Sequence, residues 1–165
     1  MKIAKIREVK MPYRGTKRSA GIDFFVPEFN EKNIKDFNDK NPHLFFTKEG
    51  VTLAPQERIL LPAGIKVDVP KGHALLVHNK SGVASKKGLD RLAEVIDCKY
   101  QGEVHVNLVN TSNDPVVIRE NEKIVQMLLI PINFSMPNEV KLEDLYTEES
   151  ERGEGGFGST NNKKI

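Results

Sequence analysis

Short apolar segments separated by proline and glycine turns occupy most of the chain. In Glu103–Asn110, for example, Val104, Val106 and Leu108 occupy alternate positions, which is the period of a half-buried strand. Regularly spaced strands bounded by turn residues are typical of an all-β sandwich, jelly roll or barrel. The predicted strands are Lys2–Val9, Gly21–Val26, Arg58–Leu61, Ile65–Asp68, His73–His78, Ala93–Ile96, Glu103–Asn110, Val116–Ile118 and Lys123–Pro131.

Two segments interrupt this pattern of strands. Residues 28–50 are polar, and within them Lys32–Lys40 predicts a short helix because Ile34 and Phe37 are three positions apart. We interpret this segment as an insertion in a surface loop. Ser81–Lys87 predicts a second short helix, since a serine stands at its start and Gly88 directly follows its end.

The last part of the chain is acidic and then rich in glycine, which predicts a β domain over 1–146 and a flexible arm over 147–165. Four glycines fall within Arg152–Thr160, and glycine lets backbone N–H groups approach a ligand closely. The same nine residues carry one cation, one aromatic ring and two hydroxyl groups, a set that suits phosphates and a base. The alternative is an ordinary flexible tail.

Composition narrows the class of protein. The chain has 165 residues, a net charge of +2 and one cysteine, Cys98. This charge is too small to indicate a nucleic-acid polymer as partner, and one cysteine excludes a disulfide framework. The four histidines show no metal-ligand spacing, and the sequence has neither a signal-peptide pattern nor a long apolar run. We therefore expect a soluble cytoplasmic protein with no membrane partner.

Two segments place reactive groups where strands are predicted to end. In Asn79–Ala84 a strand runs into a short helix, whose first N–H groups attract phosphate, although an ordinary serine cap explains the same pattern. In Ala93–Gly102 we predict a β-hairpin with Asp97 and Tyr100 at its end. The Asp97 carboxylate is suited to orienting a water molecule, and the Tyr100 ring is suited to packing on a sugar. The alternative is that Asp97 is an ordinary turn residue and Tyr100 an ordinary strand residue.

Two further segments are weaker signals by themselves. Ser19–Asp23 contains an aspartate after a glycine, which by itself favours a turn. Lys123–Ile130 is apolar except for Gln126, and a polar group inside such a run needs a partner, which a ligand can supply.

Taken together and in this order, the segments resemble the five motifs of the trimeric dUTPase family. They are Ser19–Asp23, Asn79–Ala84, Ala93–Glu103, Glu122–Leu128 and Arg152–Thr160. The resemblance implies a jelly-roll-like β subunit of a homotrimer with shared active sites. It also implies Mg²⁺-dependent hydrolysis of dUTP to dUMP and pyrophosphate, which keeps uracil out of DNA and supplies dUMP for thymidylate synthesis.

The resemblance also implies a role for each matching residue. Asp97 contacts the 3′-hydroxyl and activates the attacking water, Tyr100 excludes a 2′-hydroxyl, and Asp23 reaches Mg²⁺ through water. The uracil is bound by backbone groups of the hairpin and the phosphates by polar groups near the second helix. The implied ligands of uracil are Ala93, Glu94, Val95 and Ile96, and those of the phosphates are Lys80, Ser81, Gly82 and Gln126.

The glycine-rich segment is implied to close over the site of a neighbouring subunit. Phe157 covers the uracil there, and polar side chains bind the γ-phosphate. The implied binding residues of this arm are Arg152, Phe157, Gly158, Ser159 and Thr160.

The sequence departs from the family pattern at two positions. The family has arginine where Lys80 stands, and lysine keeps the charge but loses the two-pronged hydrogen-bonding geometry. It has glycine where Glu94 stands, and this acid can clash with the uracil, point to solvent or change the preferred base.

Two other functions remain open. A dCTP deaminase-like or bifunctional enzyme of the same superfold has glutamate as its base where Asp97 stands, which argues against it here. A regulatory protein with the dUTPase fold would bind a partner protein through residues 28–50.

Overall fold

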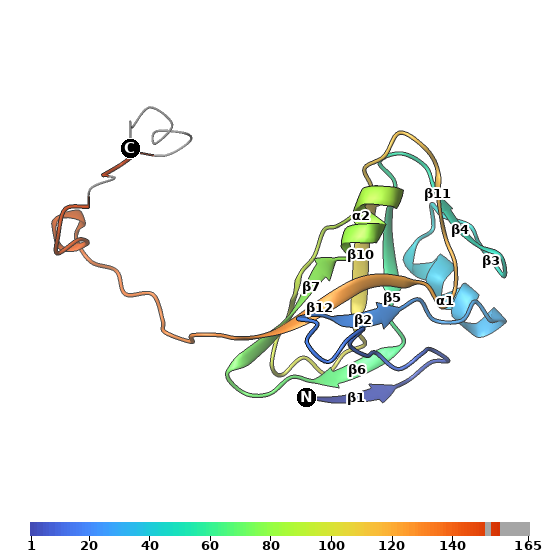
Figure 1. Ribbon diagram of the computed structural model, residues 1–165, viewed down its shortest axis with the longest axis horizontal. Helices are drawn as coiled ribbons and strands as arrows, with labels where there is room; N and C mark the ends of the chain where they lie inside the picture. The colour runs from blue at the N-terminus through green and yellow to red at the C-terminus, as the bar shows by residue number, and fades with distance from the viewer. Residues whose placement is uncertain (151–152, 156–165) are drawn as a thin grey trace. The chain divides into compact units, whose positions relative to one another are not determined.

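The computed structural model describes residues 1–150 and 153–155, and it divides into two units after Asn133. Among the described residues, the first unit contains all the strands and both α-helices (Figure 1). The described part of the second unit contains one short 3-10 helix, η1 (Leu142–Asp144). The strands are β1 (Lys2–Lys5), β2 (Ile22–Phe25), β3 (Phe46–Thr47), β4 (Gly50–Leu53), β5 (Arg58–Pro62), β6 (Ile65–Asp68), β7 (His73–Asn79), β8 (Leu89–Arg91), β9 (Val95–Ile96), β10 (His105–Asn110), β11 (Val116–Ile118) and β12 (Lys123–Pro131).

The strands form four antiparallel sheets around one hydrophobic core, which confirms the all-β, jelly-roll-like class. The sheet orders are β2-β12-β7-β9, β5-β10-β8, β11-β4-β3 and β1-β6. The predicted alternation in β10 is confirmed, since Val106 and Leu108 are buried while His105 and Asn107 are half-buried. The longest pairing joins β7 to β12, from Asn79 opposite Val125 to His73 opposite Pro131.

Some predicted strands differ from the observed ones. The first strand ends at Lys5, because the next two backbone N–H groups both turn to the carbonyl of Gly64. Strands β3, β4 and β8 were not predicted. The predicted hairpin is wrong: β9 pairs with β7, whereas β10 pairs with β5 and β8.

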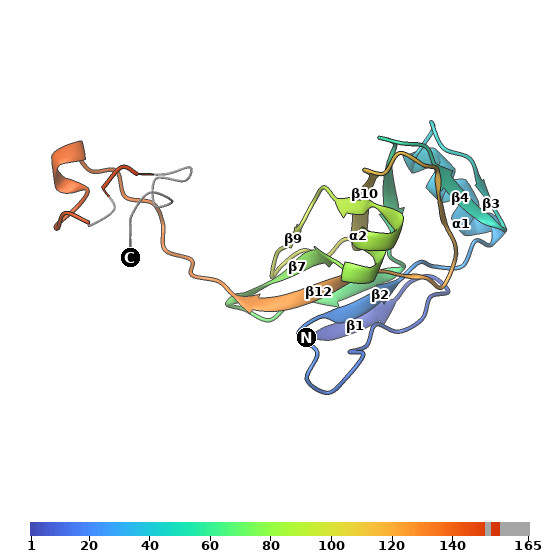
Figure 2. The same cartoon turned by 45° about the horizontal axis from the view of Figure 1, so that its top comes forward.

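Both predicted helices are confirmed: α1 (Glu31–Lys40) and α2 (Ser81–Lys87). Helix α1 lies beside β3 and β5, and α2 lies beside β8, on separate parts of the unit (Figure 2). The Asn30 side chain caps α1 by accepting a hydrogen bond of 3.0 Å from the N–H of Asn33. Gly88 ends α2 with a φ of 65°, a conformation that glycine adopts without strain.

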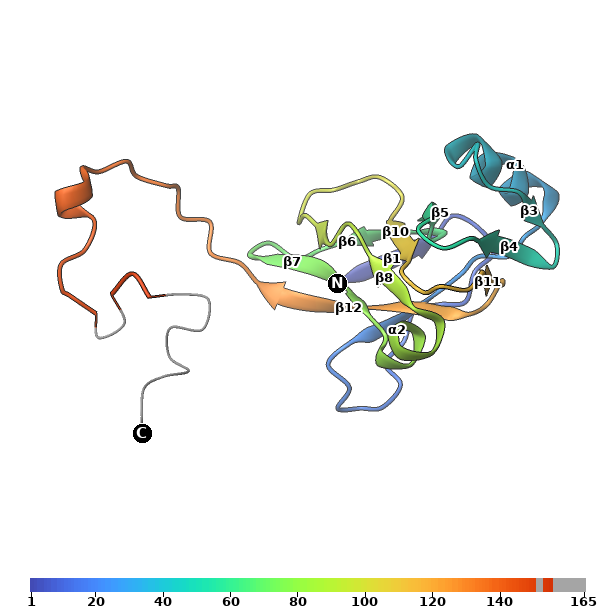
Figure 3. The same ribbon diagram turned by 90° about the horizontal axis from the view of Figure 1, so that it is seen from above.

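The 28–50 segment is more than a surface loop, because it supplies part of the core. Phe37 is fully buried and its ring meets those of Phe29 and Phe46. The buried Asn41 donates to the carbonyls of Phe37 (2.9 Å) and Leu60 (3.0 Å) and accepts from the Leu60 N–H (2.7 Å). Helix α1 is therefore fixed at one end of the unit, next to β3 (Figure 3).

Candidate active site

A cluster of charged groups forms where β2, β12 and the end of β7 meet. Asp23 in β2 is only 7% exposed, and its carboxylate pairs with two lysines. One oxygen bonds the ammonium of Lys80, directly after β7, and the other lies 3.1 Å from the ammonium of Lys123 in β12. Two ammonium groups on one carboxylate leave a surplus positive charge, which suits an anionic ligand.

Two groups of this cluster, Asp23 and Lys123, have shifted pKa values. Burial raises the pKa of Asp23, but hydrogen bonds and attraction from Lys80 and Lys123 outweigh it and hold the net pKa below its ordinary value. Hydrogen bonds to Tyr13 and then to Asp23 raise the pKa of Lys123. The Lys123 ammonium also lies 4.5 Å from the centre of the Tyr13 ring, a cation–π contact.

Helix α2 begins beside this cluster. Its N-cap is Lys80, with an extended backbone and no side-chain cap, so the alternative of an ordinary serine cap at Ser81 does not hold. Ser81 and Gly82 are exposed, and a Cβ built on Gly82 would meet nothing within 4 Å. The first N–H groups of a helix have no partner inside it, so they face open space next to the surplus charge.

The Gln126 side chain finds its partner within the protein. Its amide nitrogen donates to the carbonyl of Asn79 at 2.9 Å, directly before Lys80. Its oxygen lies over Gly21, where a Cβ would come within 2.2 Å of it. Gly21 is therefore needed to let Gln126 lie between β2 and β7.

The loop after β9 carries the second group of predicted residues. Asp97 is exposed, and its carbonyl accepts the Tyr100 N–H at 3.1 Å. The Tyr100 hydroxyl donates to the carbonyl of Glu103 at 2.8 Å. Residues 98–101 also line a cavity of about 760 Å³, together with residues of β1 and β6.

Glu94, the anomalous acid, lies at the start of this segment. Its carboxylate forms an ion pair with the guanidinium of Arg91, and its carbonyl accepts the Val77 N–H at 2.8 Å. Arg91 in turn donates to the carbonyl of Val77 at 3.1 Å. Of the neighbouring positions, Ala93 and Val95 are exposed and Ile96 is buried.

Within one chain the two groups lie toward opposite ends of β7. Ile96 pairs with Leu75, near the start of that strand, whereas Lys80 directly follows its end. The five positions from Leu75 to Lys80 span roughly 17 Å along a strand. The structure thus brings Asp23, Lys80 and Gln126 together, but not with Asp97.

Lys123 was missed by the sequence reasoning. Its position at the start of the β12 segment, near Gln126, was the available signal. In the described residues 1–150 and 153–155, no three acidic, histidine or cysteine side chains gather as metal ligands, and no helix has the length and hydropathy to span a membrane. The predicted residues of the arm lie outside these ranges: Arg152, Phe157, Gly158, Ser159 and Thr160.

Comparison with known proteins gives consistent results. The family model described as dUTPase matches residues 44–161. A deoxyuridine 5′-triphosphate nucleotidohydrolase of Fusobacterium nucleatum is 36% identical over 97% of this chain and 95% of its own length. One from Wolbachia pipientis is 33% identical, over 96% and 92%. The dUTPase of Staphylococcus bacteriophage 80alpha, solved with dUPNHPP, is 25% identical over 96% of each chain, with a TM-score of 0.74.

Proposed function

Because this chain belongs to the dUTPase family, we propose that it hydrolyses dUTP to dUMP and pyrophosphate. The structural observation that carries the proposal is the surplus positive charge at Lys80 and Lys123, beside the open start of α2. Three phosphate groups carry several negative charges, and such a site neutralises part of them before water attacks. The two relatives called deoxyuridine 5′-triphosphate nucleotidohydrolase match almost the whole chain, which supports dUTP as the substrate.

Each half of the site has its own duty in this proposal. Lys80, Ser81, Gly82 and Gln126 bind phosphate oxygens, and Asp23 orients Lys80. Asp97 takes a proton from the attacking water, and Tyr100 packs on the deoxyribose where a 2′-hydroxyl would sit. We assign backbone groups of Ala93, Glu94, Val95 and Ile96 to the uracil edge, with the Glu94 side chain drawn away toward Arg91.

We treat Mg²⁺ as part of the substrate. The described residues offer no carboxylate cluster that fits a resident ion, and both oxygens of Asp23 already bind lysines. A bound Mg²⁺ helps neutralise the triphosphate, whose own oxygens supply ligands. The action of Asp23 on this ion through water stays a prediction, as do the roles of Arg152, Phe157, Gly158, Ser159 and Thr160 over the bound nucleotide.

We propose that the complete site is shared between copies in a homotrimer. The separation of Asp97 from Lys80 along β7 supports this, because one copy alone does not bring the two groups together. Mixed trimers test the idea. Asp97→Asn and Lys80→Ala chains, each nearly inactive alone, should regain activity when refolded together, since some sites then combine two intact halves. No regained activity would place the site within one chain.

A panel of nucleotides tests the reaction itself. Pyrophosphate release should be fastest with dUTP and much slower with dTTP, dCTP and UTP. Asp97→Asn should lower the rate with dUTP by about a hundredfold or more while leaving unfolding unchanged. No pyrophosphate from dUTP would refute the proposal, and ammonia release from dCTP would favour the deaminase. We further propose that the enzyme works in the cytoplasm, keeping uracil out of DNA and supplying dUMP for thymidylate synthesis.

A further inference from the structure

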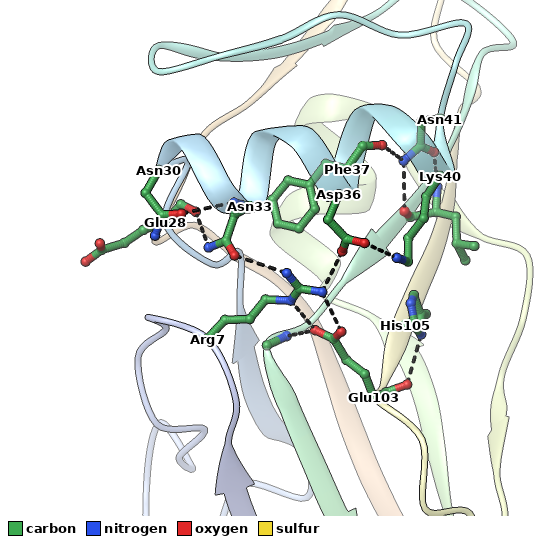
Figure 4. Close-up of polar contacts among 12 residues, drawn as sticks. Arg7, Glu28, Asn30, Asn33, Asp36, Phe37, Lys40, Asn41, Glu103 and His105 are labelled. Atoms are coloured by element: carbon green, nitrogen blue, oxygen red, sulfur yellow. Dashed lines mark hydrogen bonds and ion pairs between the residues drawn. The ribbon is translucent and has the colours of Figure 1, made fainter.

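The side chain of Arg7 joins two parts of the fold that are distant in sequence. Its guanidinium donates to both carboxylate oxygens of Glu103, at 2.7 and 2.8 Å. It also donates to Asn33 (3.1 Å) and Asp36 (2.5 Å), both on α1. Figure 4 shows Arg7 between the helix and Glu103. One side chain therefore links the 28–50 segment to the residues that precede β10.

This contact is well shielded from water. The side chains of Arg7 and Glu103 are 13% and 11% exposed, and the Glu103 carboxylate also accepts the N–H of Gly64 at 2.9 Å. Hydrogen bonding to Glu103 is the largest cause of the raised pKa of Arg7. Two-pronged pairs of this kind hold their partners in a narrow range of geometry, and removing one partner leaves an uncompensated buried charge.

The backbone of Glu103 in turn holds Tyr100. Its carbonyl accepts the Tyr100 hydroxyl at 2.8 Å, and the His105 ring also bonds it at 2.9 Å. Between them, Gly102 has no room for a side chain, since a Cβ there would lie 2.3 Å from the Tyr100 hydroxyl oxygen. The ring thus rests directly on the backbone that Arg7 fixes, so a shift of Glu103 must move Tyr100.

We propose that Arg7 and Glu103 are positioning residues for the Asp97–Glu103 loop, and that α1 braces them. The inference rests on the proposed function, in which this loop contacts the deoxyribose and the attacking water. If Tyr100 moves, the space for a 2′-hydroxyl opens, and discrimination between dUTP and UTP falls. The brace therefore acts on substrate choice rather than on phosphate binding.

The first test compares kcat/KM for dUTP and UTP. Arg7→Met keeps a similar length but loses the charge and its hydrogen bonds, and the dUTP-to-UTP ratio should fall at least roughly fivefold. We use the ratio because partial unfolding lowers the apparent kcat/KM for both substrates by the same factor and leaves the ratio unchanged. Arg7→Lys, which keeps the charge without the two-pronged contact, should give a smaller fall.

Lys40→Ala is the matched control. Lys40 pairs with Asp36 on the same helix but does not bond Arg7 or Glu103 in the described contacts, so the ratio should stay that of the wild type. An unchanged ratio in Arg7→Met, or an equal fall in Lys40→Ala, would overturn the proposal.

Hydrogen exchange gives a readout that needs no activity. Backbone amides of residues 97–104 should exchange faster in Arg7→Met than in Lys40→Ala, at matched global stability. Equal exchange would also overturn the brace. If wild-type protein did not hydrolyse dUTP, the proposed function would fail while this measurement still tested the brace. If Arg7→Met did not fold, Asp36→Asn would replace it, because this change weakens only the contact of Arg7 with α1. The dUTP-to-UTP ratio and the hydrogen exchange of residues 97–104 would then be compared with those of Lys40→Ala in the same way.

Discussion

Replacing Phe37 by alanine should destabilise the first unit strongly. Phe37 is 0% exposed, and its ring centre lies 5.9 Å from that of Phe29 and 5.4 Å from that of Phe46. Removing a buried phenylalanine costs about 3–5 kcal/mol, because the transfer free energy is lost and a cavity remains. Domains of this size have unfolding free energies of about 5–15 kcal/mol, so the loss is a large share of the total.

Phe45 offers a control of the same residue type in the same segment. It is 79% exposed, so Phe45→Ala should change the unfolding free energy by less than about 0.5 kcal/mol. Urea unfolding followed by circular dichroism measures both variants. The protein concentration must be equal throughout, because association makes apparent stability depend on concentration.

The reasoning requires a large difference between the two variants. If Phe37→Ala cost less than about 1 kcal/mol, the ring would lie in a site that collapses easily, and the 28–50 segment would not share the core. Similar losses from both variants would contradict the burial pattern in the same way.

Three further predictions concern single positions. Gly21→Ala should raise the KM for dUTP roughly tenfold, because the new methyl group displaces the Gln126 side chain. Steady-state kinetics measures this KM, and an unchanged value would contradict the prediction. Gly88→Ala should lower the free energy of unfolding by more than about 1 kcal/mol, since φ is 65° and the methyl carbon would lie 2.7 Å from Cβ of Ser112. Urea unfolding measures this, and a smaller loss would contradict the prediction. Burial raises the pKa of Asp36, but Lys40 and Arg7 lower it by more, so the pKa in the folded protein is below the ordinary value. The stability that the Asp36 carboxylate contributes is therefore complete above about pH 4 and is lost as the pH falls through the folded-state pKa. Wild-type protein should therefore lose more stability than Asp36→Asn between about pH 4 and 3, and equal losses in an acid-unfolding series would contradict this.

Local patterns predicted the elements whose cause is local. The alternation in β10 and the end of α2 at Gly88 follow from neighbouring residues, and both were found where expected. Strand β8 could not be predicted, because only Leu89 of its three residues is buried and its extended form depends on pairing with β10. The hairpin was predicted wrongly for the same reason, since the choice of β7 as the partner of β9 depends on distant residues.

For the candidate site too, the residues within motifs were predictable from the sequence, whereas their contacts were not. The motif segments identified Asp23, Lys80 and Gln126, which the structure brings together. Their partners were not predictable from local spacing. Gln126 bonds a backbone carbonyl where a ligand was considered, and the contact of Arg7 with Glu103 spans 96 positions of sequence. Such pairs are set by the folded topology, which short motifs do not encode.

The contacts of Asn41 bear on how the outer edge of one sheet is protected from edge-to-edge aggregation. Strand β5 lies at the outside of its sheet, and an outer strand with unpaired peptide groups is a template for edge-to-edge aggregation. Here both peptide groups of Leu60 bind the Asn41 side chain, the Arg58 carbonyl bonds the His43 ring at 2.8 Å, and Pro62 has no N–H. The 28–50 segment thus imitates a neighbouring strand, and a chain shortened there would need another way to cover this edge.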